Sequence, residues 1–163
     1  MGDGLLASLV ARSRFLNPKS KGCGGASSQE STEIGSMRDH TNLIAWRLAK
    51  RVVKEVVTLC ECRWRPSFSA MYGQLKRSSL SVQLNITEGY GLKEPRQKIR
   101  HYRIAYGSCL ESADVLERLV ELGESAAEPT NATCRECCRV LLGLIRRERK
   151  LLSSLERLGP PAP

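Results

Sequence analysis

Residues 95–123, PRQKIRHYRIAYGSCLESADVLERLVELG, decide the fold, because their apolar side chains recur at three- and four-residue steps. That spacing places the side chains along one face of an α-helix. The face comprises Ile99, Tyr102, Tyr106, Cys109, Ala113, Leu116 and Val120. Pro95 suits the first turn, where its missing N–H costs nothing. Gly107 costs about 1 kcal/mol against alanine within a helix, which predicts that Gly107 and Ser108 offer a flat surface to a neighbouring helix.

Three further amphipathic segments predict helices over residues 41–62, 69–87 and 130–158. Their inner faces are Leu43, Trp46, Ala49, Val53, Val56 and Cys60; then Tyr72, Leu75, Ser79, Val82 and Ile86; then Cys137, Leu141, Leu144, Leu151, Leu155 and Leu158. Residues 89–91, Gly-Tyr-Gly, are predicted to end the second of these helices. Thr133 and Glu136 predict a capping box for the last. Short connections then predict an all-α, antiparallel up-down-up-down four-helix bundle.

The composition agrees with a single helical domain. Of the 163 residues only 5% are aromatic, which favours helix-on-helix packing over a β-sheet. Residues 17–36 are rich in glycine and serine, so residues 1–36 are predicted to be a flexible extension ahead of a bundle over 37–163. No apolar run approaches the roughly 18–20 residues that a membrane-spanning helix needs.

Seven cysteines, an odd number without a secretory signal, predict reduced thiols and a cytoplasmic location. The spacing of Cys134-x-x-Cys137, with Cys138 and the pair Cys60-x-Cys62, resembles that of zinc ligands. Residues 60 and 62 point to different sides of a helix, however, whereas zinc needs four converging ligands. We therefore interpret these cysteines as buried or incidental thiols and predict no metal and no cofactor.

Groups for catalysis are scarce. The two histidines are His40 at a predicted helix start and His101 among basic residues. A nucleophilic enzyme needs a base beside its nucleophile, and neither histidine has such a neighbour in the sequence. Carboxylates at acid–base spacing are not evident either. We therefore predict that the protein is not an enzyme and has no catalytic residues.

Three motifs resemble a small bacterial family, the 23S ribosomal-RNA intervening-sequence proteins, over roughly residues 40–158. The motifs are Asn85-Ile86-Thr87-Glu88-Gly89, close to the family's Asn-Ile-Ala-Glu-Gly; Gly107-Ser108 with Glu111; and Leu43 with Trp46. The chain departs from the family pattern at Gln83, which replaces proline, and at Cys109, which replaces leucine. The resemblance implies a ring-forming four-helix bundle, often a homopentamer, without established catalytic residues. Related bundles accompany the reverse transcriptases of diversity-generating retroelements.

Asn85 and Glu88 are polar residues in an apolar setting. A buried polar group without a partner costs about 1–3 kcal/mol. We therefore interpret both as structural, with Asn85 hydrogen-bonded to a neighbouring helix and Glu88 capping backbone N–H groups or pairing with an arginine.

Positive charge is the strongest functional signal, since the net charge is +9. One block precedes and opens the third predicted helix, and the other lies within the fourth: Lys93, Arg96, Lys98, Arg100 and Arg103; Arg146, Arg147, Arg149 and Lys150. Basic side chains at this density predict binding to RNA or DNA through phosphate contacts.

Three alternatives to nucleic-acid binding remain open at the level of sequence. The third predicted helix turns acidic toward its end, so its opposite ends could join neighbouring subunits by charge: Glu111, Asp114, Glu117 and Glu121 form the acidic end. The basic runs could equally be solvated helix faces. Finally, the bundle could be an interaction scaffold for a protein client, for instance a reverse transcriptase, without touching nucleic acid.

Overall fold

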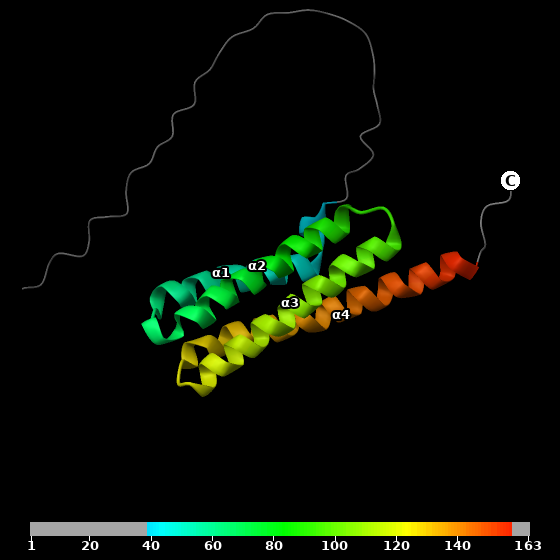
Figure 1. Ribbon diagram of the computed structural model, residues 1–163. Helices are drawn as coiled ribbons and strands as arrows, with labels where there is room; N and C mark the ends of the chain where they lie inside the picture. The colour runs from blue at the N-terminus through cyan, green and yellow to red at the C-terminus, as the bar shows by residue number, and fades with distance from the viewer. Residues whose placement is uncertain (1–38, 158–163) are drawn as a thin grey trace, which may run out of the picture. The chain divides into compact units, whose positions relative to one another are not determined.

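The computed structural model describes residues 39–157, which form four long α-helices (Figure 1). These are α1 (Ile44–Cys62), α2 (Ser69–Gly91), α3 (Pro95–Glu121) and α4 (Glu128–Arg157). Short 3₁₀ turns precede three of them: η1 (His40–Asn42), η2 (Pro66–Phe68) and η3 (Ser125–Ala127). Within these residues there is no strand, and the predicted all-α four-helix bundle is confirmed. The predictions for residues 1–36 and for Leu158 lie outside the described residues.

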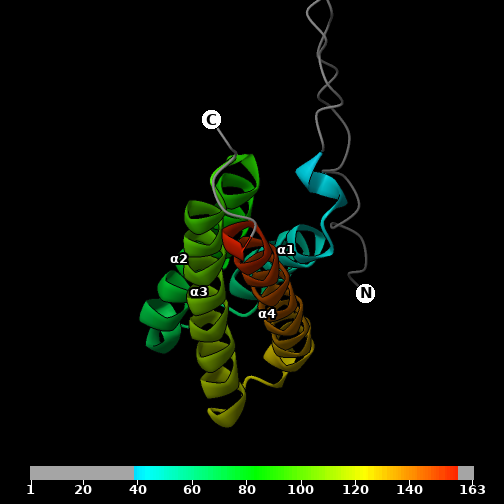
Figure 2. The same cartoon turned by 90° about the vertical axis from the view of Figure 1, so that its right-hand side faces the viewer.

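Consecutive helices pack against one another, and α1 also contacts α4. Figure 2 shows α4 between α1 and α3 in a view turned by 90°. Two hydrogen bonds fix the direction of α1 against α2. Trp46 Nε1 donates to Thr87 Oγ1 at 3.1 Å, and Tyr72 OH donates to the carbonyl oxygen of Arg63 at 2.7 Å. The start of α1 therefore meets the end of α2, and the end of α1 meets the start of α2.

The core is built largely from the predicted apolar faces. Its largest fully buried side chains are Tyr72, Tyr102, Leu75, Ile86, Leu116, Leu119 and Leu141. The prediction is wrong at Leu151 and Leu155, whose side chains are 48% and 56% exposed. The reason is the position of α1, which begins at Ile44 beside Val140 and Leu144. The last turns of α4 consequently extend beyond the start of α1.

A polar seam joins α2 to α3. The Ser78 and Ser112 hydroxyl oxygens are 2.7 Å apart, and those of Ser81 and Ser108 are 2.9 Å apart. Each hydroxyl thus has a partner, as buried polar groups generally do. Residue numbers rise along α2 while they fall along α3, so these two helices are antiparallel.

The end of α2 differs from the prediction. The helix continues through Gly91, and Gly89 has helical geometry instead of ending it. A Cβ atom built on Gly89 would lie 2.7 Å from Cε1 of Tyr102. Glycine therefore serves the close approach of α2 to α3 here, and its freedom to adopt left-handed geometry is not used.

The left-handed glycine lies instead at the end of α3. Gly123 has φ of 89°, and its N–H donates to the carbonyl oxygen of Val120 at 2.9 Å. The N–H of Glu124 donates to the carbonyl oxygen of Leu119, also at 2.9 Å. This pair of bonds is a Schellman motif, which satisfies carbonyl groups at the helix end.

The start of α4 also differs from the prediction. The helix begins at Glu128, so Thr133 lies inside it and no capping box forms with Glu136. Thr133 Oγ1 donates to the carbonyl oxygen of Pro129 at 3.2 Å, and Glu136 pairs with Arg139. A proline in the first turn, directly after η3, starts this helix earlier than the threonine pattern indicates.

A buried carboxylate ties this end of the bundle together. The Glu124 side chain is only 4% exposed, and it lies between two arginines from the α1–α2 connection. Its Oε1 is 3.8 Å from Arg63 Nε, and its Oε2 is 3.3 Å from Arg65 Nη2. The α3–α4 connection is therefore held to the α1–α2 connection by charge.

The buried Tyr102 predicts a loss of stability in alkali. Burial, with a further contribution from Glu148, raises the pKa of Tyr102 above its ordinary value of 10.0. The folded state thus keeps a neutral phenol where the unfolded state ionises, so the stabilisation is complete below pH 10 and lost as pH rises above it. We expect the free energy of unfolding to fall in this range, and to fall less steeply in Tyr102→Phe. Denaturant unfolding at several alkaline pH values measures both slopes, and equal slopes would contradict the assignment.

Candidate nucleic-acid interface

Three arginines near the start of α3 line one shallow hollow. Arg96, Arg100 and Arg103 follow at four- and three-residue steps and share a hollow of about 410 Å³ with two isoleucines. Arg96 Nη2 donates to Glu156 Oε1 at 2.9 Å, and this bond raises the pKa of Arg96. Among residues 39–157, Arg100 and Arg103 have no carboxylate oxygen within 4.0 Å. Their charges are available to an anion from outside.

The other predicted basic residues lie apart from this hollow. Lys93 precedes α3, and the half-buried Lys98 is not among the residues that line the hollow. On α4 the second block is exposed throughout: Arg146, Arg147, Arg149 and Lys150. Of these, Arg147 lines a different hollow of about 330 Å³ against the start of α1. The two predicted blocks thus do not converge on one hollow.

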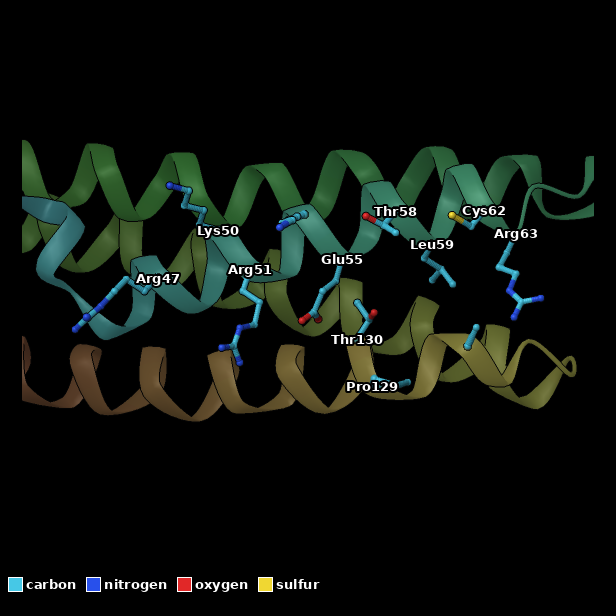
Figure 3. A pocket seen from close by; sticks show the side chains of 12 residues that line it. Arg47, Lys50, Arg51, Glu55, Thr58, Leu59, Cys62, Arg63, Pro129 and Thr130 are labelled. Carbon is cyan, nitrogen blue, oxygen red and sulfur yellow. The ribbon is translucent and has the colours of Figure 1, made fainter. Parts of the chain in front are cut away.

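A third basic cluster, on α1, was missed by the sequence analysis. It lines a groove of about 730 Å³ between α1 and α4 and consists of Arg47, Lys50, Arg51 and Lys54. Figure 3 shows Arg47, Lys50 and Arg51 projecting from α1, with Pro129 and Thr130 on α4. The signal was present as a three- and four-residue spacing of cations, which places them on one helix face. They were overlooked because apolar residues separate them, so they do not form a dense run.

The electrostatics of the α1–α4 groove are strongly one-sided. Within the described part of the chain, none of its four α1 cations lies within 4.0 Å of a carboxylate oxygen. Lys50 Nζ lies 5.3 Å from the centre of the Trp46 ring, which is a cation–π contact. Glu55 also lines the groove, and one of its oxygens is buried without a hydrogen-bond partner. The apolar residues that line the groove are Leu59, Cys62, Ala126 and Pro129.

Two of the four acidic residues of α3 pair with cations within the bundle. Glu117 accepts from Arg135 on α4 at 2.7 Å, Glu121 pairs with Arg118, and Glu111 accepts from the Gln74 amide on α2. Asp114 is exposed, with no cation within 4.0 Å among the described residues. Two of these four acids thus pair with a cation, whereas within residues 39–157 only Arg96 of the five basic residues near the start of α3 pairs with an acid.

The predicted pair Asn85 and Glu88 meets a histidine on α3. Asn85 Nδ2 donates to the carbonyl oxygen of Ser81 at 2.9 Å, and Asn85 Oδ1 is 3.2 Å from His101 Nδ1. Glu88 Oε2 lies 3.1 Å from the same nitrogen. Asn85 thus bonds a neighbouring helix as predicted, whereas Glu88 faces a histidine and not an arginine or a backbone N–H. The three side chains join α2 to α3.

Gly107 and Ser108 of the second motif lie in different surroundings. Ser108 lies at the α2–α3 seam, but Gly107 is exposed and a Cβ built there would have nothing within 4 Å. The predicted close helix contact at Gly107 is therefore wrong for this bundle. Helical rotation places residue 107 about 100° away from residue 108, which leaves the glycine on the outer surface.

Comparison with known proteins identifies the family. A model of the 23S rRNA-intervening sequence proteins matches residues 41–145, which is more than half of the chain. The chain belongs to this family. The intervening-sequence match ends within α4, ahead of Arg146 and the rest of the second basic block. The comparison with curated proteins gave no match.

A solved structure shares the intervening-sequence fold. It is a protein with unknown function from the S23 ribosomal protein family of Bacteroides thetaiotaomicron, and it superposes with a TM-score of 0.58 at 20% sequence identity. The superposition covers 63% of this chain and 96% of the other. In the residues that the structure describes, none of the helices has the length and apolar character to span a membrane.

Proposed function

We propose that this intervening-sequence protein is a non-enzymatic bundle that assembles into a homo-oligomeric ring and binds RNA or DNA through phosphate contacts. The observation that carries the proposal is the set of cations without internal partners. Of the nine predicted basic residues, only Arg96 is in an ion pair within residues 39–157. The α1 cluster adds Arg47, Lys50, Arg51 and Lys54 to this set. Such side chains suit sequence-independent neutralisation of a phosphate backbone.

The acidic side chains favour an external anion over charge pairing between subunits. If the two ends of α3 joined neighbouring copies, both ends would need free charges. Glu117 and Glu121 are instead occupied by Arg135 and Arg118 of the same chain. Only Glu111 and Asp114 lack a cation among these acids in the described residues, so the more numerous unpaired cations favour an anion from outside the bundle.

Exposed apolar side chains support self-association. Leu80 and Leu84, one turn apart on α2, are 46% and 50% exposed, and Ile104 on α3 is 43% exposed. Contiguous exposed apolar surface commonly marks an interface. A homopentamer has five copies of the 18.1 kDa chain, and sedimentation equilibrium measures the assembly mass directly. A monomer at micromolar concentration would contradict the ring.

One observation favours the second candidate, a scaffold for a protein client such as a reverse transcriptase. The α1–α4 groove is lined by both cationic and apolar side chains, and none of its lining residues is aromatic. Single-stranded nucleic acids usually stack bases on aromatic side chains, whereas an amphipathic protein segment needs an apolar floor. A client would occupy this groove and leave the α3 arginines free.

The deciding experiment is fluorescence anisotropy of the full chain with labelled RNA and DNA over about 50–200 mM salt. We expect binding that weakens steeply with salt, because each phosphate contact contributes a slope of about −0.7 to −0.9 in log K against log salt. Replacing Arg100 and Arg103 by glutamine should reduce the magnitude of the slope by about 1.4–1.8. The matched control replaces two internally paired arginines, Arg118 and Arg139, by glutamine.

Binding by the α3 variant and by the control variant distinguishes the possible contact surfaces. Loss of binding in the α3 variant but not in the control places the contacts on α3. Equal loss in both variants would mean that net charge alone attracts the nucleic acid. No binding at the lowest salt would remove the nucleic-acid proposal and leave the protein client, which the groove favours.

A further inference from the structure

Three buried cysteines from two helices meet at one point between α3 and α4. The Sγ atoms of Cys109, Cys134 and Cys138 all lie within 4.8 Å of one another, and those of Cys109 and Cys134 are 3.7 Å apart. Cys134 and Cys138 are one helical turn apart on α4, so both face α3. Cys109 supplies the third sulfur atom from α3.

The sequence motif Cys134-x-x-Cys137 is not the pair that converges. Cys137 turns toward α1, and its Sγ lies 3.8 Å from the carbonyl oxygen of Ala45. Among the described residues, no histidine, carboxylate or fourth cysteine joins the three sulfur atoms. The cluster thus offers three soft ligands and no more.

The buried thiols shift one another's pKa in different directions. Contacts of Cys138 with Cys109 and Cys134 lower the pKa of Cys138, and Arg135 lowers it further. The hydrogen bond with Cys109, the contact with Cys138 and burial raise the pKa of Cys134.

The triangle has the right size for a single metal ion. A metal–thiolate bond of about 2.3 Å requires sulfur atoms about 4.0 Å apart when three ligands surround the ion in a plane. The Sγ atoms of Cys109 and Cys134 are 3.7 Å apart and no pair exceeds 4.8 Å, so shifts of less than about 1 Å suffice. Cys109 and Cys134 are fully buried and Cys138 is 8% exposed, so an ion enters past Cys138.

We propose that Cys109, Cys134 and Cys138 form a binding site for one soft, thiophilic metal ion, Cu(I). Thiolate ligands select soft ions, and Cu(I) accepts three of them in a plane, whereas structural zinc needs a fourth ligand. Each thiol that becomes a ligand breaks its S–H bond, forms an S–Cu bond and releases one proton to solvent. Copper stays Cu(I), so no electron is transferred. Binding therefore weakens as pH falls.

Anaerobic competition with a coloured Cu(I) chelator tests the site on the full, reduced chain. We expect the protein to withdraw one copper per chain from the chelator. X-ray absorption of the loaded protein should show three sulfur neighbours at about 2.3 Å. Cys138→Ser should weaken Cu(I) binding by more than about 100-fold, since losing a ligand costs at least as much as losing an outer-shell partner.

Two controls separate the site from general thiol binding. Cys62→Ser removes an exposed thiol, and Cys137→Ser removes a buried thiol next to Cys138 in the chain. Both variants should keep one copper. Circular dichroism checks folding, and if Cys138→Ser does not fold, the X-ray result on the unaltered chain decides.

The proposal fails under three results. These are no copper withdrawn from the chelator, two sulfur neighbours instead of three, and full binding by a folded Cys138→Ser variant. If the same three cysteines bound Zn(II) more tightly than Cu(I), the ion of this site would be zinc and not copper. None of these readouts depends on nucleic acid, so the metal site and the proposed function stand or fall separately.

Discussion

Gly89→Ala should destabilise the bundle by about 1–3 kcal/mol, the usual cost of overpacking a core. The added Cβ would lie 2.7 Å from Cε1 and 2.9 Å from Cδ1 of Tyr102, whose ring is buried and cannot turn away. Alanine has a better helix propensity than glycine, which stabilises the variant by about 1 kcal/mol. The expected range already includes this gain. Urea unfolding followed by helical circular dichroism measures the change.

The same substitution at Gly107 is the matched control. This glycine is also helical, but a Cβ there has nothing within 4 Å. Gly107→Ala should therefore stabilise the protein by about 0.5–1 kcal/mol, because only the helix propensity changes. Opposite signs at the two positions would confirm that Gly89 and not Gly107 provides the close contact. Destabilisation of similar size at both would contradict it.

Glu124→Ala should lower the free energy of unfolding by about 2–3 kcal/mol, because it removes a buried carboxylate placed between two arginines. Arg63 and Arg65 are about half exposed, so water can solvate them once the partner is gone. The loss should accordingly stay below the roughly 3–5 kcal/mol of a fully buried pair. The backbone hydrogen bond of residue 124 to Leu119 is kept in this variant.

Glu121→Ala provides the comparison for Glu124. Its side chain is 53% exposed and pairs with Arg118 on the same helix, so its loss should cost less than about 0.5 kcal/mol. Arg65→Ala should fall between the two. If Glu124→Ala costs no more than Glu121→Ala, the buried carboxylate does not hold the two connections together.

The apolar periodicity was sufficient to predict the helices but not their ends. All five predicted inner residues of α2 are buried, because a repeating pattern averages over many contacts. The end of α2 depends on one contact instead. Glycine commonly ends a helix, but Gly89 lies inside α2, where it allows the close approach of Tyr102 from α3. A tertiary neighbour of this kind leaves no mark in the local sequence.

The candidate sites were predictable only where their residues are close in sequence. Arg96, Arg100 and Arg103 stand in a dense basic run and do share a hollow. The thiol cluster escaped prediction because Cys109 comes from another helix and lies 25 residues before Cys134. Sequence spacing pointed to Cys137, but consecutive residues of a helix lie about 100° apart, so Cys137 faces α1 while Cys138 faces α3.

The paired serines between α2 and α3 make the bundle intolerant of sliding. If α3 moved by one turn along α2, at most one of the two serine pairs could re-form, because Ser108 and Ser112 are themselves one turn apart. Each lost hydrogen bond costs about 0.5–1.5 kcal/mol. An entirely aliphatic boundary would accept several offsets with little penalty, since such packing has no directional bonds. The four hydroxyls consequently favour one axial position of α3 along α2, and with it the position of the basic end of α3.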